Sequence, residues 1–387
     1  MKTMWPKQKL CNVCQLINGR AYSKAELLAS GKYPVLRVGN FFTNSHWYYS
    51  DMELDENKYC DSGDLLYAWS ASFGPRVWNG GRVIFHYHIW KVVPRETLAE
   101  KKFLYYFFQW DTEKIKQDQG TGTTMMHVSK GSMDDRDIYL PPLPEQRRIV
   151  DILDEAFEGL ATAKANAEKN LKNARAIFGS ELNAIFTRKG DGWQDKALSE
   201  IATTFGRGKS RYRPRNASHL YGGKYPFVQT GDIRNADHII TEYSQTYSEA
   251  GLAQSKLWPK GTICITIAAN IAETAVLGFD ACFPDSVIGV VANPKEADVG
   301  FIEYLLQSFK VRIQGMGKGS AQANINMGTF ENEQFPFPPA SQQKQIVSKL
   351  DDLREETQRL ESIYQRKLEK LDALKKSLLH HAFTGQL

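Results

Sequence analysis

The 387-residue sequence has few cysteines, no long hydrophobic runs and little excess charge. Its five cysteines are an odd number in a long chain, which predicts a reducing environment and no disulfide framework. No stretch of about eighteen apolar residues occurs, and the opening MKTMWPKQKL lacks the apolar segment of a secretory signal. We therefore expect a globular, cytoplasmic protein with no membrane partner.

Metal-ligand motifs are also scarce. Cys11 and Cys14 form a single CxxC, whereas a structural zinc site needs a second pair at suitable spacing. His86 and His88 would face the same side of an expected strand, VIFHYHIW, but no third histidine or carboxylate is close in sequence. We expect no metal site, and a packed or surface role for the histidine pair.

The net charge is only +5, from 49 basic and 44 acidic residues. A protein that coats nucleic acid without sequence preference needs a far larger positive charge. Any DNA binding by this chain is therefore expected to be selective or to depend on a partner.

The second half of the chain repeats the first. Residues 141–186 overlay residues 338–383 without gaps at a constant offset of 197, and upstream GKYPVLRVGN corresponds more loosely to GKYPFVQTGD. The identical pairs include Pro141/Pro338, Gln146/Gln343, Ile149/Ile346, Leu153/Leu350, Asp154/Asp351 and Phe186/Phe383. The repeat predicts globular units at 1–140 and 189–337, followed by helical spacers at 141–188 and 338–387.

Each globular unit shows short apolar stretches typical of strands and one apolar helix. The expected strands cover residues 35–38, 65–69 and 83–90 in the first unit, and 227–230, 263–267 and 287–291 in the second. The expected helices lie near 103–117 and 301–314. Because strands and helices do not alternate as βαβ units, the pattern predicts an α+β fold.

Both spacers carry apolar residues at spacings of three, four and seven, which predicts a coiled-coil seam. The seam residues are Ile149, Leu153, Leu160 and Leu171 in the first spacer, and Ile346, Leu350, Leu353, Leu360, Leu368 and Leu371 in the second. Because the halves share one order, a pseudo-twofold arrangement with antiparallel helices is self-consistent. A helix of 42 residues would be roughly 63 Å long.

Proline-rich joints, LPPLPEQRRIV and PFPPASQQKQIV, precede the two spacers. Proline favours extended backbone, so each joint predicts an abrupt change from globular unit to helix. Pro144 suits the first turn of its helix, and Ser341 can cap the other. Two similar but diverged heads on a stiff spacer would suit two unlike half-sites on one DNA duplex, about 34–36 Å or a multiple apart.

Several features occur together in this chain: the two joints, their helices, the stretches GTGTTMMH and GKGSAQAN, and the closing HHAFTGQL. In this combination the chain resembles the specificity subunit of type I restriction-modification systems. The resemblance covers nearly the whole chain. It implies two target-recognition domains that read double-stranded DNA, and helices that set the gap and dock two methyltransferase subunits. It also implies restriction subunits as partners, with S-adenosylmethionine and ATP bound by the partners and no cofactor or catalytic residue here.

The stretch GRGKSRYRPR predicts a flexible basic loop that reaches phosphates or guanine edges. Its candidate contacts are Lys209, Arg211, Tyr212, Arg213 and Arg215, and those of its first-half counterpart NGRAYSK are Arg20, Tyr22 and Lys24. A solvated basic loop without a DNA role is the alternative.

Each GKYP strand is expected to end in a turn, at Gly39-Asn40 or Gly231-Asp232, followed by polar residues suited to base recognition. The candidates there are Asn40, Asn44 and His46 in the first half, and Gln229, Arg234 and Asn235 in the second. Lys318 and Gln322 in the second glycine-rich stretch are candidates near the DNA backbone, with a tight packing turn as the alternative.

Two other functions remain open from sequence. A DNA adenine methyltransferase with a fused recognition domain would need an [N/D]PP[Y/F] motif and a glycine-rich cofactor turn, and neither is found. A coiled-coil scaffold that ignores DNA is compatible with the helices, although the unequal basic loops of the two heads argue against it.

Overall fold

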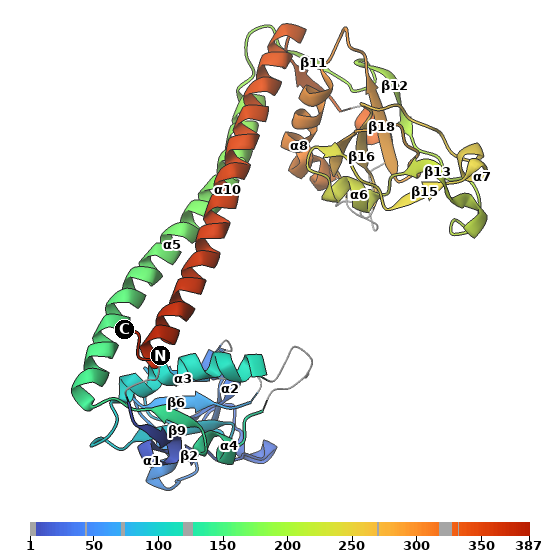
Figure 1. Ribbon diagram of the computed structural model, residues 1–387. Helices are drawn as coiled ribbons and strands as arrows, with labels where there is room; N and C mark the ends of the chain where they lie inside the picture. The colour runs from blue at the N-terminus through green and yellow to red at the C-terminus, as the bar shows by residue number, and fades with distance from the viewer. Residues whose placement is uncertain are drawn as a thin grey trace. The chain divides into compact units, whose positions relative to one another are not determined.

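The computed structural model describes residues 5–42, 45–70, 74–118, 127–268, 271–316, 327–331 and 333–387. The chain forms two compact units, one of Met1–Glu168 with Gln365–Leu387 and one of Lys169–Tyr364. Both boundaries fall inside the two long helices, α5 (Leu143–Arg188) and α10 (Ala340–Phe383) (Figure 1). Each unit is therefore a globular head with one end of each long helix.

The head of the first unit contains three small sheets. They have the strand orders β2-β9-β6-β7, β4-β3-β8-β5 and β1-β10. The strands are β1 (Lys7–Lys9), β2 (Cys14–Asn18), β3 (Tyr33–Leu36), β4 (Tyr48–Ser50), β5 (Tyr59–Cys60), β6 (Leu65–Ala68), β7 (Gly74–Val77), β8 (Val83–Phe85), β9 (Ile89–Pro94) and β10 (Asp137–Tyr139). The helices of this head are α1 (Leu10–Val13), α2 (Val38–Phe42), α3 (Lys101–Asp118) and α4 (Lys130–Asp134), with short 3-10 turns at Lys24–Glu26 and Glu56–Lys58.

The head of the second unit contains a five-stranded sheet, β12-β18-β16-β17-β14, and the pairs β13-β15 and β11-β19. The strands are β11 (Gln194–Lys196), β12 (Ala202–Arg207), β13 (Tyr221–Phe227), β14 (Ile239–Ile240), β15 (Gln245–Tyr247), β16 (Ile263–Thr266), β17 (Thr274–Leu277), β18 (Val287–Ala292) and β19 (Phe335–Phe337). The helices are α6 (Thr230–Asn235), α7 (Glu249–Ala253), α8 (Val299–Met316) and α9 (Met327–Glu331), with a 3-10 turn at Ser218–Leu220. Mostly antiparallel pairing with separate helices confirms the α+β class in both heads.

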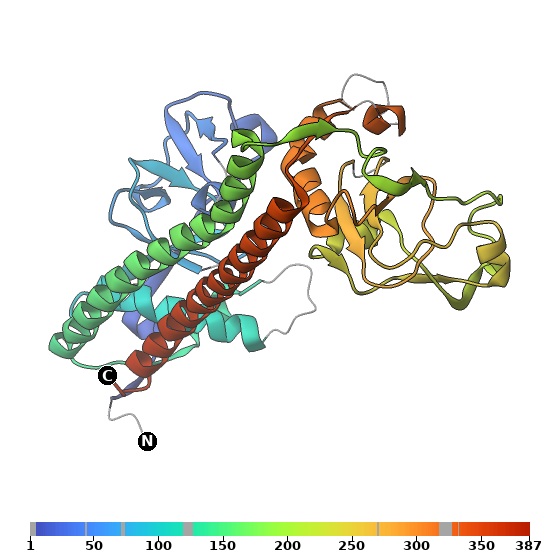
Figure 2. The same ribbon diagram turned by 90° about the horizontal axis from the view of Figure 1, so that it is seen from above.

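The two long helices pack antiparallel in both units (Figures 1 and 2). In the first unit the Nζ of Lys164 lies 3.0 Å from the Asp372 carboxylate. In the second, the Nε of Arg175 lies 2.9 Å from the Glu361 carboxylate, and Lys349 pairs with Glu181 at 2.5 Å. In the second unit, the partner on α10 moves back from Glu361 to Lys349 as the residue on α5 moves forward from Arg175 to Glu181. The two helices are therefore antiparallel. Of the expected seam residues, Ile149, Leu153, Leu171 and Leu350 are buried, while Leu160, Ile346, Leu353, Leu360, Leu368 and Leu371 are half-buried.

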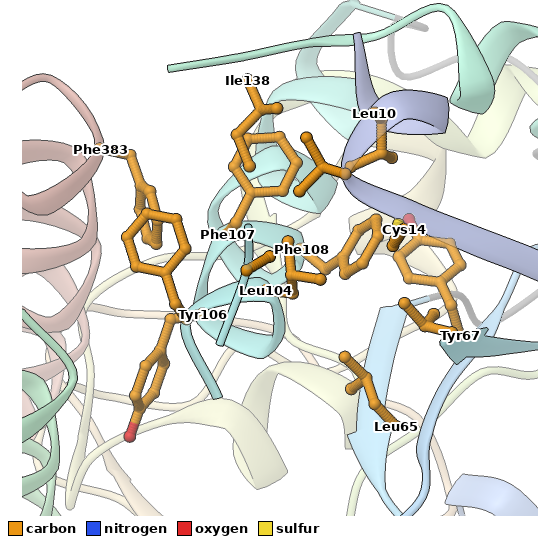
Figure 3. Packing of buried hydrophobic residues seen from close by; sticks show 14 of the residues in the cluster. Leu10, Cys14, Leu65, Tyr67, Leu104, Tyr106, Phe107, Phe108, Ile138 and Phe383 are labelled. Atoms are coloured by element: carbon orange, nitrogen blue, oxygen red, sulfur yellow. The ribbon is translucent and has the colours of Figure 1, made fainter. Parts of the chain in front are cut away.

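Both heads build their cores against the ends of these helices. In the first unit α3 packs on the end of α10, and Figure 3 shows Phe383 beside Phe107, with ring centroids 5.8 Å apart. Phe103 also contacts Phe383, at 5.2 Å. The repeat-related contact in the second unit joins Phe301 of α8 to Phe186 of α5, at 5.4 Å. The same head-to-helix contact is thus made twice.

A buried glutamine fixes each proline-rich joint. Gln146 donates to the carbonyls of Leu98 and Pro141, both at 2.8 Å, and accepts from the Glu100 N–H at 2.8 Å. Gln343 makes the same three bonds, to the carbonyls of Glu296 and Pro338 and from the N–H of Asp298, at 2.8 to 3.2 Å. Both side chains are at most 1% exposed. The abrupt joint is therefore held by an amide that satisfies buried backbone groups on both sides of it.

The expected helices 103–117 and 301–314 are confirmed as α3 and α8, and the structure also corrects four local predictions. The expected strand 83–90 is two strands in different sheets, because the chain turns at Tyr87-His88 between β8 and β9. The expected strand 227–230 ends at Phe227. The turns at Gly39-Asn40 and Gly231-Asp232 are the short helices α2 and α6. Pro144 does lie in the first turn of α5, but α10 begins at Ala340, so Ser341 is inside the helix and not at its cap.

Among the described residues, no helix is both long enough and apolar enough to cross a bilayer.

Candidate nucleic-acid interface

Two glycines show that the basic loops of the two heads occupy equivalent places. A Cβ on Gly19 would lie 2.3 Å from the Phe85 carbonyl oxygen, and a Cβ on Gly208 would lie 2.3 Å from that of Phe283. The Gly19 N–H donates to the Ile89 carbonyl at 3.1 Å, as the Gly208 N–H donates to that of Val287 at 2.9 Å. Only glycine allows so close an approach. The pairing of NGRAYSK with GRGKSRYRPR is therefore confirmed.

In the second head, most guanidiniums of the basic loop are bound by the protein itself. Arg215 forms two hydrogen bonds with the Asp285 carboxylate, at 2.8 and 2.9 Å, and Arg207 donates to the Asp285 carbonyl at 2.7 Å. Arg213 folds back on the loop and donates to the carbonyls of Ser210 and Tyr212, at 2.7 and 2.9 Å. These arginines shape the loop, and Asp285, which pattern reading missed, anchors it.

All four arginines of the loop are exposed, but Arg211 differs from the others because it has no hydrogen bond or ion pair with any described residue. Tyr212 is also exposed, and its ring packs edge-on against His219 at 5.0 Å. An unpaired guanidinium beside an exposed aromatic ring can bind a phosphate or a base edge with little rearrangement.

Two lysines lie close together beside this loop. The Nζ of Lys256 lies 3.6 Å from the ring centroid of Trp258, and its pKa is lowered by burial and by the charge of Lys209. Lys209 itself is exposed, and its backbone carbonyl accepts from the Ser255 hydroxyl at 2.8 Å. A bound phosphate would relieve the repulsion between the two ammonium groups. Lys256 was not a sequence candidate, because it lies far along the chain from the loop.

Helix α6 exposes two of the predicted base-reading residues, Arg234 and Asn235, and neither has a side-chain partner among the described residues. Gln229 is half-buried just before the helix, and its backbone N–H donates to the Asp232 carboxylate at 2.8 Å. The structure therefore gives Gln229 a place at the helix start and leaves Arg234 and Asn235 free to contact a ligand.

In the first head, the two predicted basic residues, Arg20 and Lys24, differ in their contacts. Arg20 pairs with Glu26 at 2.7 Å, and this hydrogen bond lowers the pKa of Glu26 to about 2. Tyr22 lies 5.2 Å below the Arg20 guanidinium, and its hydroxyl is buried without a partner among the described residues. Lys24 is exposed. Of these three predicted contacts, Lys24 is the one that the first head presents freely to solvent.

The other candidates of the first head differ in their surroundings. The side-chain amide of Asn40 donates to the His46 carbonyl at 2.6 Å, so it holds the segment after α2. His46 is exposed and packs edge-on against Tyr48 at 5.0 Å, and the Arg37 guanidinium lies 5.2 Å from the centroid of the same Tyr48 ring. Asn44, Lys318 and Gln322 lie outside the described residues.

The histidine pair of the first head, for which the sequence predicts a packed or surface role, lies in a cluster of aromatic rings that the sequence did not predict. The turn from His86 to His88 meets Trp69, with the Trp69 and His88 centroids 4.9 Å apart and the Trp69 N–H donating to the Tyr87 carbonyl at 2.8 Å. His127 packs against the same Trp69 at 6.0 Å. Burial lowers the pKa of His86 to about 4, so its ring is neutral near pH 7. No three metal-binding side chains are grouped for coordination in the part of the chain described here.

The turn 86–88 of the first head is equivalent to the turn 284–286 of the second, because each follows the carbonyl that contacts Gly19 or Gly208. One turn presents His-Tyr-His and the other Pro-Asp-Ser. The frames that hold the loops are alike, while the side chains on them differ in size, charge and hydrogen-bonding groups.

The repeated heads and paired helices define a protein built from two copies of one domain. Residues 3–172 and 190–370 match the family model described as "Type I restriction modification DNA specificity domain", and the chain belongs to this family. It is 21% identical to the type I restriction enzyme EcoBI specificity subunit of Escherichia coli, over 99% of this chain and 86% of that protein. It is 22% identical to the MjaVIII specificity subunit of Methanocaldococcus jannaschii, over 84% of this chain and 80% of that protein.

Solved structures show the same fold. A chain from a study titled "Structural basis underlying complex assembly and conformational transition of the type I R-M system" matches with a TM-score of 0.80 and 19% identity, over the full length of both chains. The HsdS subunit from Thermoanaerobacter tengcongensis matches with a TM-score of 0.61 and 18% identity, over 99% of this chain and 97% of that one.

Proposed function

We propose that this chain is the DNA-binding specificity subunit of a type I restriction-modification complex. Each head, at 1–140 and 189–337, reads one half of a bipartite target, and the spacers at 141–188 and 338–387 set the gap and dock methyltransferase subunits. Methylation with S-adenosylmethionine and ATP-driven cleavage belong to methyltransferase and restriction partners, and this chain catalyses no reaction.

One observation supports this proposal above the others. The contacts that join head to helices recur in both units, as in the glutamine joints, whereas the exposed residues around the basic loops differ between the heads. Two heads that share their head-to-helix contacts but differ in their exposed loops are suited to reading two different half-sites. A scaffold that ignored DNA would have no need for the unpaired Arg211 and the adjacent lysines.

Selection from a library of random DNA duplexes tests the proposal, with the chain bound to its methyltransferase partner. We expect the selected sequences to contain two short conserved blocks at a fixed spacing. Arg211→Ala should weaken preference in one block, while Arg82→Ala, at an exposed arginine of the first head that pairs with Glu56 and Asp61, should leave that block unchanged. A single continuous block, or no enrichment, would refute the proposal.

A further inference from the structure

A polar cluster ties the segment after α6 to the long helix α10 within the second unit. Arg354 and Gln358, one turn apart on α10, donate to the two oxygens of the Asp237 carboxylate, the Gln358 bond being 2.6 Å. Asp237 comes two residues after the last residue of α6. We call Asp237, Arg354 and Gln358 the Asp237 clamp.

Arg354 lies where three helices meet. Its side chain is 19% exposed, and its guanidinium lies 5.6 Å from the Phe178 ring centroid of α5 and 6.0 Å from that of Tyr304 on α8. One guanidinium nitrogen of Arg354 binds one oxygen of the Asp237 carboxylate, and Gln358 binds the other oxygen, so the two donors together fix the direction of the carboxylate. The clamp therefore defines the orientation of Asp237 relative to α10.

The next residue, His238, is fixed from α8. Its Nδ1 lies 2.5 Å from the carboxylate of Glu303, which is fully buried and also accepts from Thr274 at 3.1 Å. The His238 ring stacks on Tyr304, with centroids 4.7 Å apart and planes at 18°. Its φ of +68° is unfavourable for a residue other than glycine, so these contacts hold it in a conformation it would otherwise avoid.

Among the described residues of the first unit, no such clamp occurs at the equivalent position. The repeat offset of 197 places Phe157 where the second unit has Arg354, and Lys375 where it has Phe178. The Lys375 Nζ lies 5.1 Å from the Phe157 ring centroid. The ring is on α5 and the cation on α10 in both units, so it is the repeat-equivalent positions that have exchanged cation and ring. A phenylalanine cannot bind a carboxylate, whereas the neighbouring tyrosine-to-aspartate bonds, Tyr106–Asp154 and Tyr304–Asp351, occur in both units.

We propose that Arg354 is a positioning residue for sequence recognition by the second head. Through Asp237 it holds α6 in a fixed orientation, so that Arg234 and Asn235 meet the base edges of one half-site correctly. This inference rests on the proposed DNA-reading function. Hydrogen bonds to base edges require accurate placement of both partners, and a shift of about 1 Å in the supporting structure is enough to lose them.

The test measures binding of the methyltransferase-bound complex to duplexes with single mismatches in either half of the selected motif. Arg354→Met keeps much of the side-chain volume and removes the charge. We expect it to reduce discrimination against mismatches about tenfold in one half, the half that Arg211→Ala weakens, and less than twofold in the other. Arg359→Met is the matched control, because Arg359 is exposed on the same helix and pairs with Glu356 of that helix.

Two substitutions at the other end of the clamp complete the test. Asp237 is 66% exposed, so Asp237→Ala removes the carboxylate without changing the packing around Arg354, and it decides the question should Arg354→Met fail to fold. We expect Asp237→Ala to reproduce the loss in one half and Asp237→Glu to restore most of the discrimination. An equal loss in both halves, or wild-type discrimination by folded Asp237→Ala, would overturn the positioning role and leave the proposed function intact. Failure of the wild-type complex to read two blocks would instead refute the proposed function, and the inference with it.

Discussion

At the residue scale, the number of cations in a loop does not equal the number available to a ligand. The loop 207–215 contains five basic residues, yet Arg207, Arg213 and Arg215 are held by Asp285 and by backbone carbonyls. Such bonds restrict the conformational freedom of these side chains and give the loop a defined shape. Arg211 and Lys209 remain exposed on a preformed surface.

His86 provides a residue-scale prediction about pH. Burial, the neighbouring His88 and Arg37 lower its pKa from 6.5 to about 4. Between these values the unfolded chain binds the proton and the folded chain does not, so stability falls as the pH drops from 6.5 towards 4. With allowance for solvent screening of a half-buried ring, we expect His86 to lower the free energy of unfolding by about 1 kcal/mol between pH 7.5 and pH 5.

Urea unfolding followed by tryptophan fluorescence at the two pH values measures this loss. His86→Phe keeps an aromatic ring in the same place and should show a smaller decrease in stability on acidification. Identical pH dependence in the two proteins would mean that His86 does not carry the effect.

Sequence alone identified the basic loop but not its partners. The residues NGRAYSK and GRGKSRYRPR were paired correctly because a local glycine pattern survives in both halves. Asp285 lies 70 residues from Arg215, and Lys256 lies on a different segment from Lys209, so no local spacing connects them. Tyr22 and Asn40 have polar side chains, but the Tyr22 hydroxyl is buried and the Asn40 amide is bound to the His46 carbonyl.

At the element scale, the joint between head and helix depends on one buried amide per unit. The fully buried Gln146 side chain donates to two backbone carbonyls and accepts from one backbone N–H. The proline run removes donors from the backbone and favours extended conformation, and the glutamine side chain compensates by reaching back across the first turn.

We expect Gln146→Ala to lower the free energy of unfolding by about 3 kcal/mol, because it removes three hydrogen bonds made by a fully buried side chain. Gln343→Ala should cost a similar amount in the second unit. The control is Gln365→Ala, at an exposed position of α10, which should change stability by less than about 0.5 kcal/mol. Denaturant unfolding of the four proteins is the measurement, and equal stability of Gln146→Ala and Gln365→Ala would contradict the assigned role.

Helices were predicted more accurately than strands for a physical reason. The apolar faces of α3 and α8 extend over 18 residues each, which is long enough for the helical period to be read. The stretch 83–90 is a continuous run of β-favouring residues, and nothing in it marks the change of sheet after Phe85. The short helices α2 and α6 have five and six residues, too few for a periodic pattern.

At the scale of the whole molecule, the repeat explains how one chain can read two different half-sites. Each unit contains the start of one long helix and the end of the other, with an equivalent aromatic contact and an equivalent glutamine joint. Changes in the exposed loops therefore need not disturb the packing of head against helices. This duplication was visible in the sequence because the joint and helix residues are under the same packing constraints in both halves.

The helices supply a second whole-molecule prediction. Removing seven residues from α5 and the seven facing residues from α10 shortens the pair by about 10 Å, and it keeps the same faces together because seven residues are close to two turns. We expect the gap between the two DNA blocks to shrink by about three base pairs, at 3.4 Å per base pair, with both blocks unchanged in sequence. Sequencing of selected duplexes measures both quantities, and altered letters within a block would show that the spacer takes part in reading.

The central claim is that each head reads its own half-site. A chain in which residues 189–337 are replaced by a second copy of residues 1–140 tests it most directly, through the motif methylated when this chain is expressed with its partner methyltransferase. We predict an inverted repeat of a single half-site, because the antiparallel helices would present identical heads to opposite strands. Retention of the original second block would show that recognition resides elsewhere in the complex.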